Sequence, residues 1–154
     1  MRSLRLLLLA LVVAMQDVSS VWPWCPDGWI HYESICVWVS SEKTVWWKAW
    51  DNCTALGSHL AFIETEAESN TLTGIFVALD IESVWIGLND LNVEGSFVWA
   101  DQEPVTYTNY FVGEPNRNGS GREERCVAIR KDYGYKWSDE YCFDERQFIC
   151  RMDI

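Results

Sequence analysis

Six cysteines constrain the fold of this chain more than any other feature of its sequence. Their number is even, and all of them follow residue 24. An even set in a secreted domain favours disulfide bonds, although spacing alone leaves the pairing open. The alternative use is zinc binding, but there is no Cys-x-x-Cys pair and only His31 and His59 could assist, so no zinc site is expected. The cysteines are Cys25, Cys36, Cys53, Cys126, Cys142 and Cys150.

The first twenty residues have the pattern of a secretory signal peptide. Arg2 and Arg5 give a basic start, residues 6–15 are apolar, and residues 18–20 supply small side chains for cleavage. The apolar run is too short for a membrane span, and no second run is longer. We therefore expect residues 1–20 to be a signal peptide, residues 21–154 to form one secreted domain, and no membrane span.

The chain is acidic, with 23 Asp and Glu against 12 Lys and Arg and a formal net charge of −11. A surface of this sign repels the phosphates of nucleic acids and of anionic lipids, so neither is an expected partner. The excess of carboxylates fits a protein that binds cations, although most acidic surfaces are simply solvated. Charge therefore excludes partners more firmly than it identifies one.

Two segments have the apolar periodicity of amphipathic helices. In residues 44–56 apolar side chains recur at helical spacing, with Thr44 placed as an N-cap and Gly57 as a stop signal. Residues 65–68 read Thr-Glu-Ala-Glu, a capping box that begins a second helix. Because the first helix carries Cys53 on its apolar face, we expect this cysteine in the core.

Short apolar runs bounded by turn residues predict strands around these helices. Residues 101–121 lack periodicity and contain many turn formers, and a loop of about twenty residues in a compact domain is usually functional. Early helices, several strands and one long late loop indicate an α+β domain. The predicted strands cover residues 30–39, 59–63, 84–88, 97–99, 126–129, 135–137 and 147–151.

Four side chains with oxygen donors gather in sequence around the late loop. Glu114 and Asn116 lie within it, Glu124 follows it, and Asp139 ends a Trp-Ser-Asp run shortly before Cys142. Hard oxygen ligands without imidazole or thiolate partners suit Ca²⁺. We therefore predict a Ca²⁺ site built from this loop and a neighbouring strand.

Six short motifs, in order along nearly the whole mature chain, resemble those of the C-type lectin family. Each motif alone is weak, but six in the right order make the resemblance specific. The motifs are Cys25-Pro26-Asp27-Gly28-Trp29, Trp46-x-x-Ala49-x-x-x-Cys53, Gly57-Ser58-His59-Leu60-Ala61, Trp85-Ile86-Gly87-Leu88, Glu114-Pro115-Asn116 and Trp137-Ser138-Asp139, with the last three cysteines.

The resemblance implies a fold and a disulfide pattern. The fold is an α+β double-loop domain with two helices, small antiparallel sheets and three disulfides. The implied pairs join the first helix to the last strand, tie together the region under the binding loop, and close the N-terminal hairpin that marks the long form of the family. They are Cys53–Cys150, Cys126–Cys142 and Cys25–Cys36.

The resemblance also implies which residues hold the ion. Glu114 and Asn116 flank a proline, and the family has a cis peptide bond before this proline that turns both side chains toward one Ca²⁺. Glu124 and Asp139 match further ligands. Ser138 stands where the family usually has asparagine, and a hydroxyl lacks the amide N–H that donates to a sugar. The expected ligands, which would also bind the sugar, are Glu114, Asn116, Glu124, Ser138 and Asp139.

In the family this Ca²⁺ is the sugar site, because two vicinal hydroxyls complete its oxygen shell. The Glu-Pro-Asn sequence is similar to that of members that bind mannose, fucose or N-acetylglucosamine, whereas galactose binders resemble Gln-Pro-Asp. We therefore expect a lectin for mannose-type glycans on microbial or cell surfaces, active in innate immunity or particle recognition. The alternative is a C-type-lectin-like domain that binds protein or mineral and no sugar.

Paired carboxylates could also indicate a glycoside hydrolase. Glu114 and Glu124 are interpreted better as metal ligands, however, and ligated carboxylates are poor general acids. The expectation is therefore that the protein is not an enzyme. Single sites of this type bind sugar weakly, so function would need several sites, and a homo-oligomer is one way to provide them.

An auxiliary Ca²⁺ site is the next feature that the resemblance suggests. Asp90 and Glu94 match two of its ligands in the family. Arg125 stands where the family has an acid, which puts a cation where a cation should bind. Two Asn-x-Ser/Thr sequons complete the set of candidate sites. Asn118 begins one inside the late loop, and Asn52 begins another, whose middle cysteine and helical setting disfavour its use.

Overall fold

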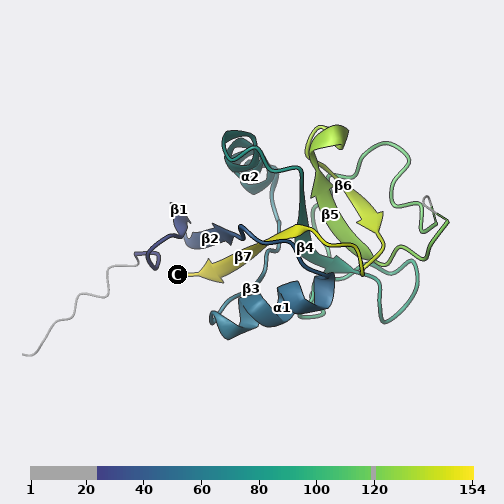
Figure 1. The fold of residues 1–154 in the computed structure, drawn as a ribbon, viewed down its shortest axis with the longest axis horizontal. Coiled ribbons are helices and arrows are strands. Elements are labelled where there is room, and N and C mark those ends of the chain that lie inside the picture. The colour runs from purple at the N-terminus through teal and green to yellow at the C-terminus, as the bar shows by residue number, and fades with distance from the viewer. Residues whose placement is uncertain (1–23, 119–120) are drawn as a thin grey trace, which may run out of the picture.

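The computed structural model describes residues 24–118 and 121–154. The expected signal peptide over residues 1–20 and the domain boundary that follows it lie outside the described residues. Two α-helices and seven strands form an α+β domain, as predicted (Figure 1). In chain order they are β1 Ile30–Tyr32, β2 Ile35–Val39, α1 Trp46–Ala55, β3 His59–Leu60, α2 Glu66–Ala78, β4 Ser83–Asn89, β5 Cys126–Arg130, a 3-10 turn Lys131–Tyr133, β6 Lys136–Glu140 and β7 Gln147–Asp153.

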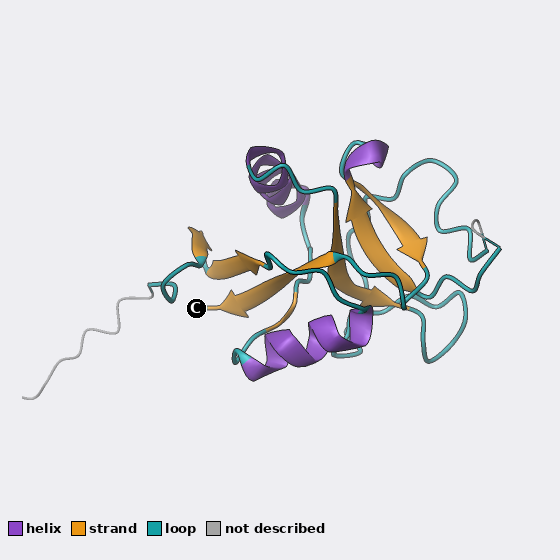
Figure 2. Ribbon diagram, in the orientation of Figure 1, coloured by secondary structure: helices purple, strands orange, loops and turns teal. Residues whose placement is uncertain are grey.

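The strands form two antiparallel groups that meet at the centre of the molecule. Their order is β1-β2-β7-β4-β5-β6. The short strand β3 pairs with β7 at Cys150 and Arg151. The two groups join where β4 and β7 run parallel, with Val84 opposite Gln147 and Trp85 opposite Phe148. Figure 2 shows the helices on opposite sides of these central strands, and the long loops beyond β5 and β6 at one end. This end carries the late loop singled out in the sequence.

The first helix buries only part of the predicted apolar face, and its cap differs from the prediction. Trp46, Ala49 and Cys53 are fully buried, whereas Trp50 and Leu56, which share the apolar spacing, are 36% and 48% exposed. The N-cap is Val45, and no side chain caps the helix. Thr44 does not cap because its backbone pairs with Arg146, with N–O distances of 2.8 and 3.0 Å in the two directions. Thr44 therefore lies one residue before the N-cap position, outside the first turn of α1.

The capping box of the second helix is confirmed. The Thr65 hydroxyl accepts a hydrogen bond from the Glu68 amide at 3.1 Å, and the Glu68 carboxylate reaches back to the Glu64 amide at 2.8 Å. The predicted strand at residues 97–99 is wrong as a strand. Val98 alone forms isolated bridges, to Asn89 and to Pro104, because the loop turns away on either side of it.

The three disulfides join the pairs that the family resemblance implied. Cys25 is bonded to Cys36, Cys53 to Cys150 and Cys126 to Cys142. Tryptophans fill the interior between them, and the indole N–H groups of two are satisfied by backbone. Trp46 Nε1 donates to Ile86 O at 2.9 Å and Trp85 Nε1 to Thr44 O at 3.0 Å. The fully buried tryptophans are Trp46, Trp85, Trp99 and Trp137.

Candidate calcium and sugar site

Backbone pairing holds the late loop against β6. Phe111 N donates to Trp137 O at 2.9 Å, and Trp137 N donates to Asn109 O at 2.9 Å. One turn further, Glu114 N donates to Phe111 O at 3.0 Å, and the Glu114–Pro115 peptide bond is cis. The Glu-Pro-Asn motif is therefore positioned by β6, the strand that also carries Asp139.

A small polar hollow of about 210 Å³ lies where this loop meets β6. It collects four of the five residues expected to bind Ca²⁺, which come from positions far apart in the chain. Carboxylates dominate its lining, and the fourth acid, Glu140, was not predicted from the sequence. The lining residues are Glu114, Asn116, Glu124, Arg130, Tyr133, Asp139 and Glu140.

Hydrogen bonds order the acids of this hollow unequally. Both carboxylate oxygens of Asp139 accept from backbone, Oδ1 from Asn116 N at 2.9 Å and Oδ2 from Arg117 N at 2.6 Å. Glu114 Oε1 accepts from the Asn116 side-chain amide at 2.9 Å. Glu114 Oε2 is buried and has no hydrogen-bond partner among the described residues. A buried carboxylate oxygen without a donor is costly unless a cation or another donor reaches it.

The pKa of Glu114 also shows that this carboxyl group has too few favourable partners. The pKa of Glu114 is raised to about 7, first by burial of its carboxyl group and then by the neighbouring carboxylates of Asp139, Glu124 and Glu140. Desolvation and neighbouring negative charge both disfavour an ionised carboxylate. A cation bound among these oxygens would reverse the effect of the neighbouring charges, since it would favour the ionised form of each acid.

Comparison with known proteins places this chain in a family. The family model of the lectin C-type domain matches residues 42–152. The chain is a C-type lectin domain. Perlucin from Haliotis laevigata is 34% identical over 131 residues, which cover 84% of this chain and 83% of perlucin.

Two solved structures show how varied the relatives of this C-type lectin domain are. The carbohydrate-recognition domain of cow CD23, determined in the presence of a GlcNAc2Man3 oligosaccharide, is 32% identical with a TM-score of 0.75, covering 84% of this chain and 96% of that one. A calcium-independent type II antifreeze protein is 27% identical with a TM-score of 0.72, covering 84% and 94%. C-type lectin domains generally bind Ca²⁺, but this second relative is calcium-independent.

Ser138 of the C-type lectin domain is placed differently from the other expected ligands. It does not line the hollow; its buried hydroxyl donates to Glu140 Oε1 at 2.6 Å. The same carboxylate pairs with Arg130 Nη1 at 2.8 Å and with Arg146 Nη2 at 2.5 Å. Ser138 and Glu140 are two apart on β6 and therefore share a face of the strand. The two arginine partners of Glu140 come from β5 and from the turn before β7, contacts that no local pattern reveals.

The chemistry of the donor set fits Ca²⁺, although the side chains are not gathered into a coordination shell. Within residues 24–118 and 121–154, no group of three or more His, Cys, Asp or Glu is arranged to hold a metal ion. Hard carboxylate and amide oxygens are nevertheless the ligands that Ca²⁺ takes, and the unpartnered Oε2 of Glu114 points to one missing partner. Glu114 and Asn116, the two residues that would hold the ion from the late loop, here bond to each other.

The expected auxiliary site is organised around an arginine. Asp90 is fully buried, and its Oδ1 accepts from Arg125 Nε at 2.8 Å while Oδ2 accepts from Gly95 N at 2.6 Å. Arg125 also donates to the backbone carbonyl of Asp90 and to Glu123. Glu94 is exposed on the same loop. The Arg125 guanidinium thus supplies the positive charge that Asp90 requires.

The remaining sequence-predicted sites lie on the surface. Asn52 is exposed on α1, and Asn118 is exposed in the late loop, whereas residues 119 and 120 of its sequon lie outside the described residues. None of the helices formed by the described residues has both the length and the apolar character to cross a membrane.

Proposed function

We propose that this C-type lectin domain binds mannose-type glycans through one Ca²⁺ held by Glu114, Asn116, Glu124 and Asp139. The observation that carries the proposal is the buried Glu114 Oε2, which lacks a partner in a hollow of acidic side chains. A divalent cation would balance the negative charge of these carboxylates. Its coordination shell also leaves room for two sugar hydroxyls.

The residues of the hollow have different roles in binding the sugar and in holding the loop. The carboxylates of Glu114 and Glu124 accept hydrogen bonds from the two hydroxyls, and the Asn116 amide donates to one of them. Asp139 keeps the loop in place through the amides of Asn116 and Arg117. We expect mannose, fucose and N-acetylglucosamine to be preferred over galactose because the motif is Glu-Pro-Asn. The mannose-containing oligosaccharide present with the cow CD23 domain supports this choice.

The cellular role belongs to the same proposal. Residues 1–20 direct secretion, and the protein acts outside the cell as a non-enzymatic recognition lectin for microbial or cellular glycans. Because one shallow site binds a sugar weakly, we expect several copies to act together, as a homo-oligomer or on a clustered ligand. Size-exclusion chromatography with light scattering measures the oligomeric state directly.

Retention on mannose-agarose tests the sugar site. The disulfide-intact protein should be retained in Ca²⁺ and eluted by EDTA or mannose but not by galactose. Glu114→Gln should abolish retention because it removes a carboxylate from the hollow. Glu103→Gln is the matched control, since Glu103 is an exposed acid outside the hollow and its loss should change nothing. Equal elution by galactose, or retention of Glu114→Gln, would refute the assignment.

One observation favours a second function, the binding of a protein or mineral without Ca²⁺. The Ser138 hydroxyl is engaged by Glu140 rather than directed to the hollow. Isothermal titration with Ca²⁺ distinguishes the two functions. Heat of binding that disappears in Glu114→Gln supports the sugar site. A wild-type protein that takes up no Ca²⁺ would replace the lectin proposal with this second function.

A further inference from the structure

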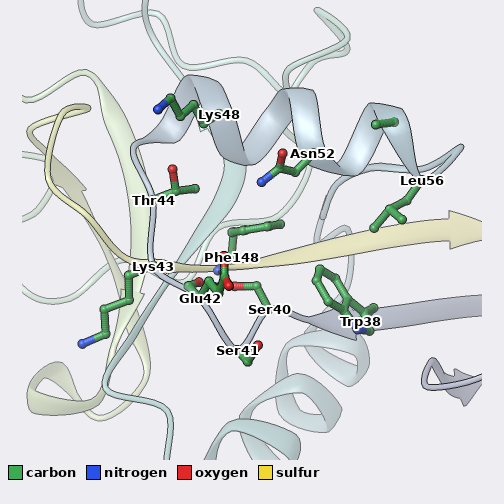
Figure 3. A pocket seen from close by; sticks show the side chains of 11 residues that line it. Trp38, Ser40, Ser41, Glu42, Lys43, Thr44, Lys48, Asn52, Leu56 and Phe148 are labelled. Atoms are coloured by element: carbon green, nitrogen blue, oxygen red, sulfur yellow. Dashed lines mark hydrogen bonds between the residues drawn. The ribbon is translucent and has the colours of Figure 1, made fainter.

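A groove of about 640 Å³ runs between α1 and the strands beneath it, away from the acidic hollow. Half-buried Trp38 supplies aromatic surface and packs edge-to-face on the buried Phe148, with ring centroids 5.8 Å apart. Polar residues of the segment between β2 and α1 form the rim (Figure 3). The groove and the hollow have no lining residue in common among those described. The groove is lined by Trp38, Ser40, Ser41, Glu42, Lys43, Thr44, Lys48, Asn52, Ala55, Leu56 and Phe148.

Asn52 stands in the helical wall of this groove. Lys48, Asn52 and Leu56 follow one another at intervals of four residues, which places them on one face of α1. Figure 3 shows the Asn52 side chain directed from α1 toward Phe148 and the strands. The next residue, Cys53, points into the core, whereas Thr54 is exposed. The complete sequon, Asn52-Cys53-Thr54, is thus carried on a surface turn whose asparagine faces a groove.

We propose that Asn52 carries an N-linked glycan and that the first sugar residues of this glycan lie in the groove. The new bond joins Asn52 Nδ2 to the anomeric carbon of an N-acetylglucosamine. The bond from that carbon to the pyrophosphate of a lipid-linked oligosaccharide donor breaks. The pyrophosphate leaves with the bonding electrons, and the amide gives up one proton. The modification depends on entry into the secretory pathway, which residues 1–20 would direct, and it does not depend on the acidic hollow.

The chemistry of the groove fits this occupant. A pyranose ring has an apolar face and an edge of hydroxyls, so it packs on aromatic surface while its edge bonds to polar groups. Half-buried Trp38, which packs on the buried Phe148, offers the aromatic surface, and Lys43, Lys48 and Glu42 offer donors and an acceptor at the rim. The glycan would cover the apolar surface of this face, which is otherwise open to solvent.

The position of the sequon also sets the order of events. Cys53 is fully buried and bonded to Cys150, and Asn52 lies within the regular helix α1. The sequon is therefore presented in extended form only before α1 docks and the Cys53–Cys150 bond closes. The glycan is added to the unfolded chain, and the groove forms around it as the last strand joins the sheet.

Peptide mapping of the protein secreted from animal cells tests the modification. Enzymatic release of N-glycans in heavy-oxygen water converts a modified asparagine into labelled aspartate. The label is expected at Asn52 in the wild type and in Thr54→Ser, which keeps the sequon, but not in Thr54→Val, which removes the hydroxyl with little change of shape. Asn118→Gln should leave the labelling of Asn52 unchanged. An unlabelled Asn52 in the secreted wild type would overturn the proposal.

Binding of an anionic naphthalene dye tests the location of the glycan. Thr54→Val should raise dye fluorescence severalfold over wild type and Thr54→Ser, because the aromatic floor is uncovered. Trp38→Ala in the Thr54→Val chain should cancel the rise. If Thr54→Val is not secreted, Asn52→Gln takes its place. Equal fluorescence with and without the glycan would refute the placement in the groove. Mannose retention is read separately, so failure of one proposal leaves the other testable.

Discussion

Arg125→Ala is the substitution from which we expect the largest structural effect. In the wild type the Arg125 guanidinium contacts both a carboxylate oxygen and the carbonyl oxygen of Asp90. Asp90 is fully buried, so removing its partner leaves a charge without compensation, which typically costs about 3–5 kcal/mol. The Gly95 amide still donates to Asp90 Oδ2 in the variant, which places the expected loss near the lower end, about 3 kcal/mol.

Thermal and urea unfolding measure this loss. For a domain of this length, about 3 kcal/mol corresponds to a fall in melting temperature on the order of 10 °C. Arg122→Ala is the matched control, because the side chains of the Arg122–Asp144 pair are 48% and 29% exposed. Such a pair should contribute at most about 1 kcal/mol. Asp90→Asn combined with Arg125→Ala should recover part of the stability, since the buried charge is gone. An Arg125→Ala protein as stable as Arg122→Ala would refute the reasoning.

Three further predictions concern the hollow. The pKa of Glu114 is about 7, and only the ionised carboxylate is a ligand, so Ca²⁺ affinity should fall as the pH drops. Calorimetric titration should show a roughly tenfold loss of affinity from pH 8 to pH 6. An affinity that does not change with pH would exclude Glu114 as a ligand. Ser138 does not line the hollow, but the longer amide side chain of Ser138→Asn should extend toward it and strengthen Ca²⁺ and mannose binding; weaker binding in both titrations would contradict this. Glu140→Gln should cost about 1–2 kcal/mol in urea unfolding, because Arg130 and Arg146 lose their shared carboxylate but keep Asp132 and Asp144. An unchanged midpoint would count against the network.

Local patterns predicted the helices better than the site. Periodicity identified the three residues that α1 buries, although it also included the exposed Trp50 and Leu56. The capping box at Thr65 was predicted correctly, since it depends on neighbours a few residues apart. The Thr44 cap failed because a long-range bridge to Arg146 overrides the local preference. Spacing could not select the disulfide pairs either; the family resemblance did. Cysteines 97 residues apart, such as Cys53 and Cys150, meet only through the fold.

In the candidate site, too, the sequence predicted some residues, and others were found only in the structure. The sequence singled out Glu114, Asn116, Glu124 and Asp139, and the structure brings these four to one hollow. No sequence pattern pointed to Glu140, because the two arginines that hold this acid come from other elements. Arg125 was recognised as a departure from the family pattern. Only the structure shows that its guanidinium bonds to the buried Asp90 carboxylate.

The pairing of β2 with β7 determines how the domain can be displayed. Ile35, near the beginning of the described chain, lies opposite Asp153, near its end, and Figure 1 shows these strands at the far side of the molecule from the late loop. A linker attached at either end of the described domain therefore lies on the side away from the late loop. Copies joined end to end, or fixed by one end to a surface, would present their hollows side by side with no strand rearranged. Engineered arrays of this domain can be built from either terminus, with linker length setting the spacing between sites.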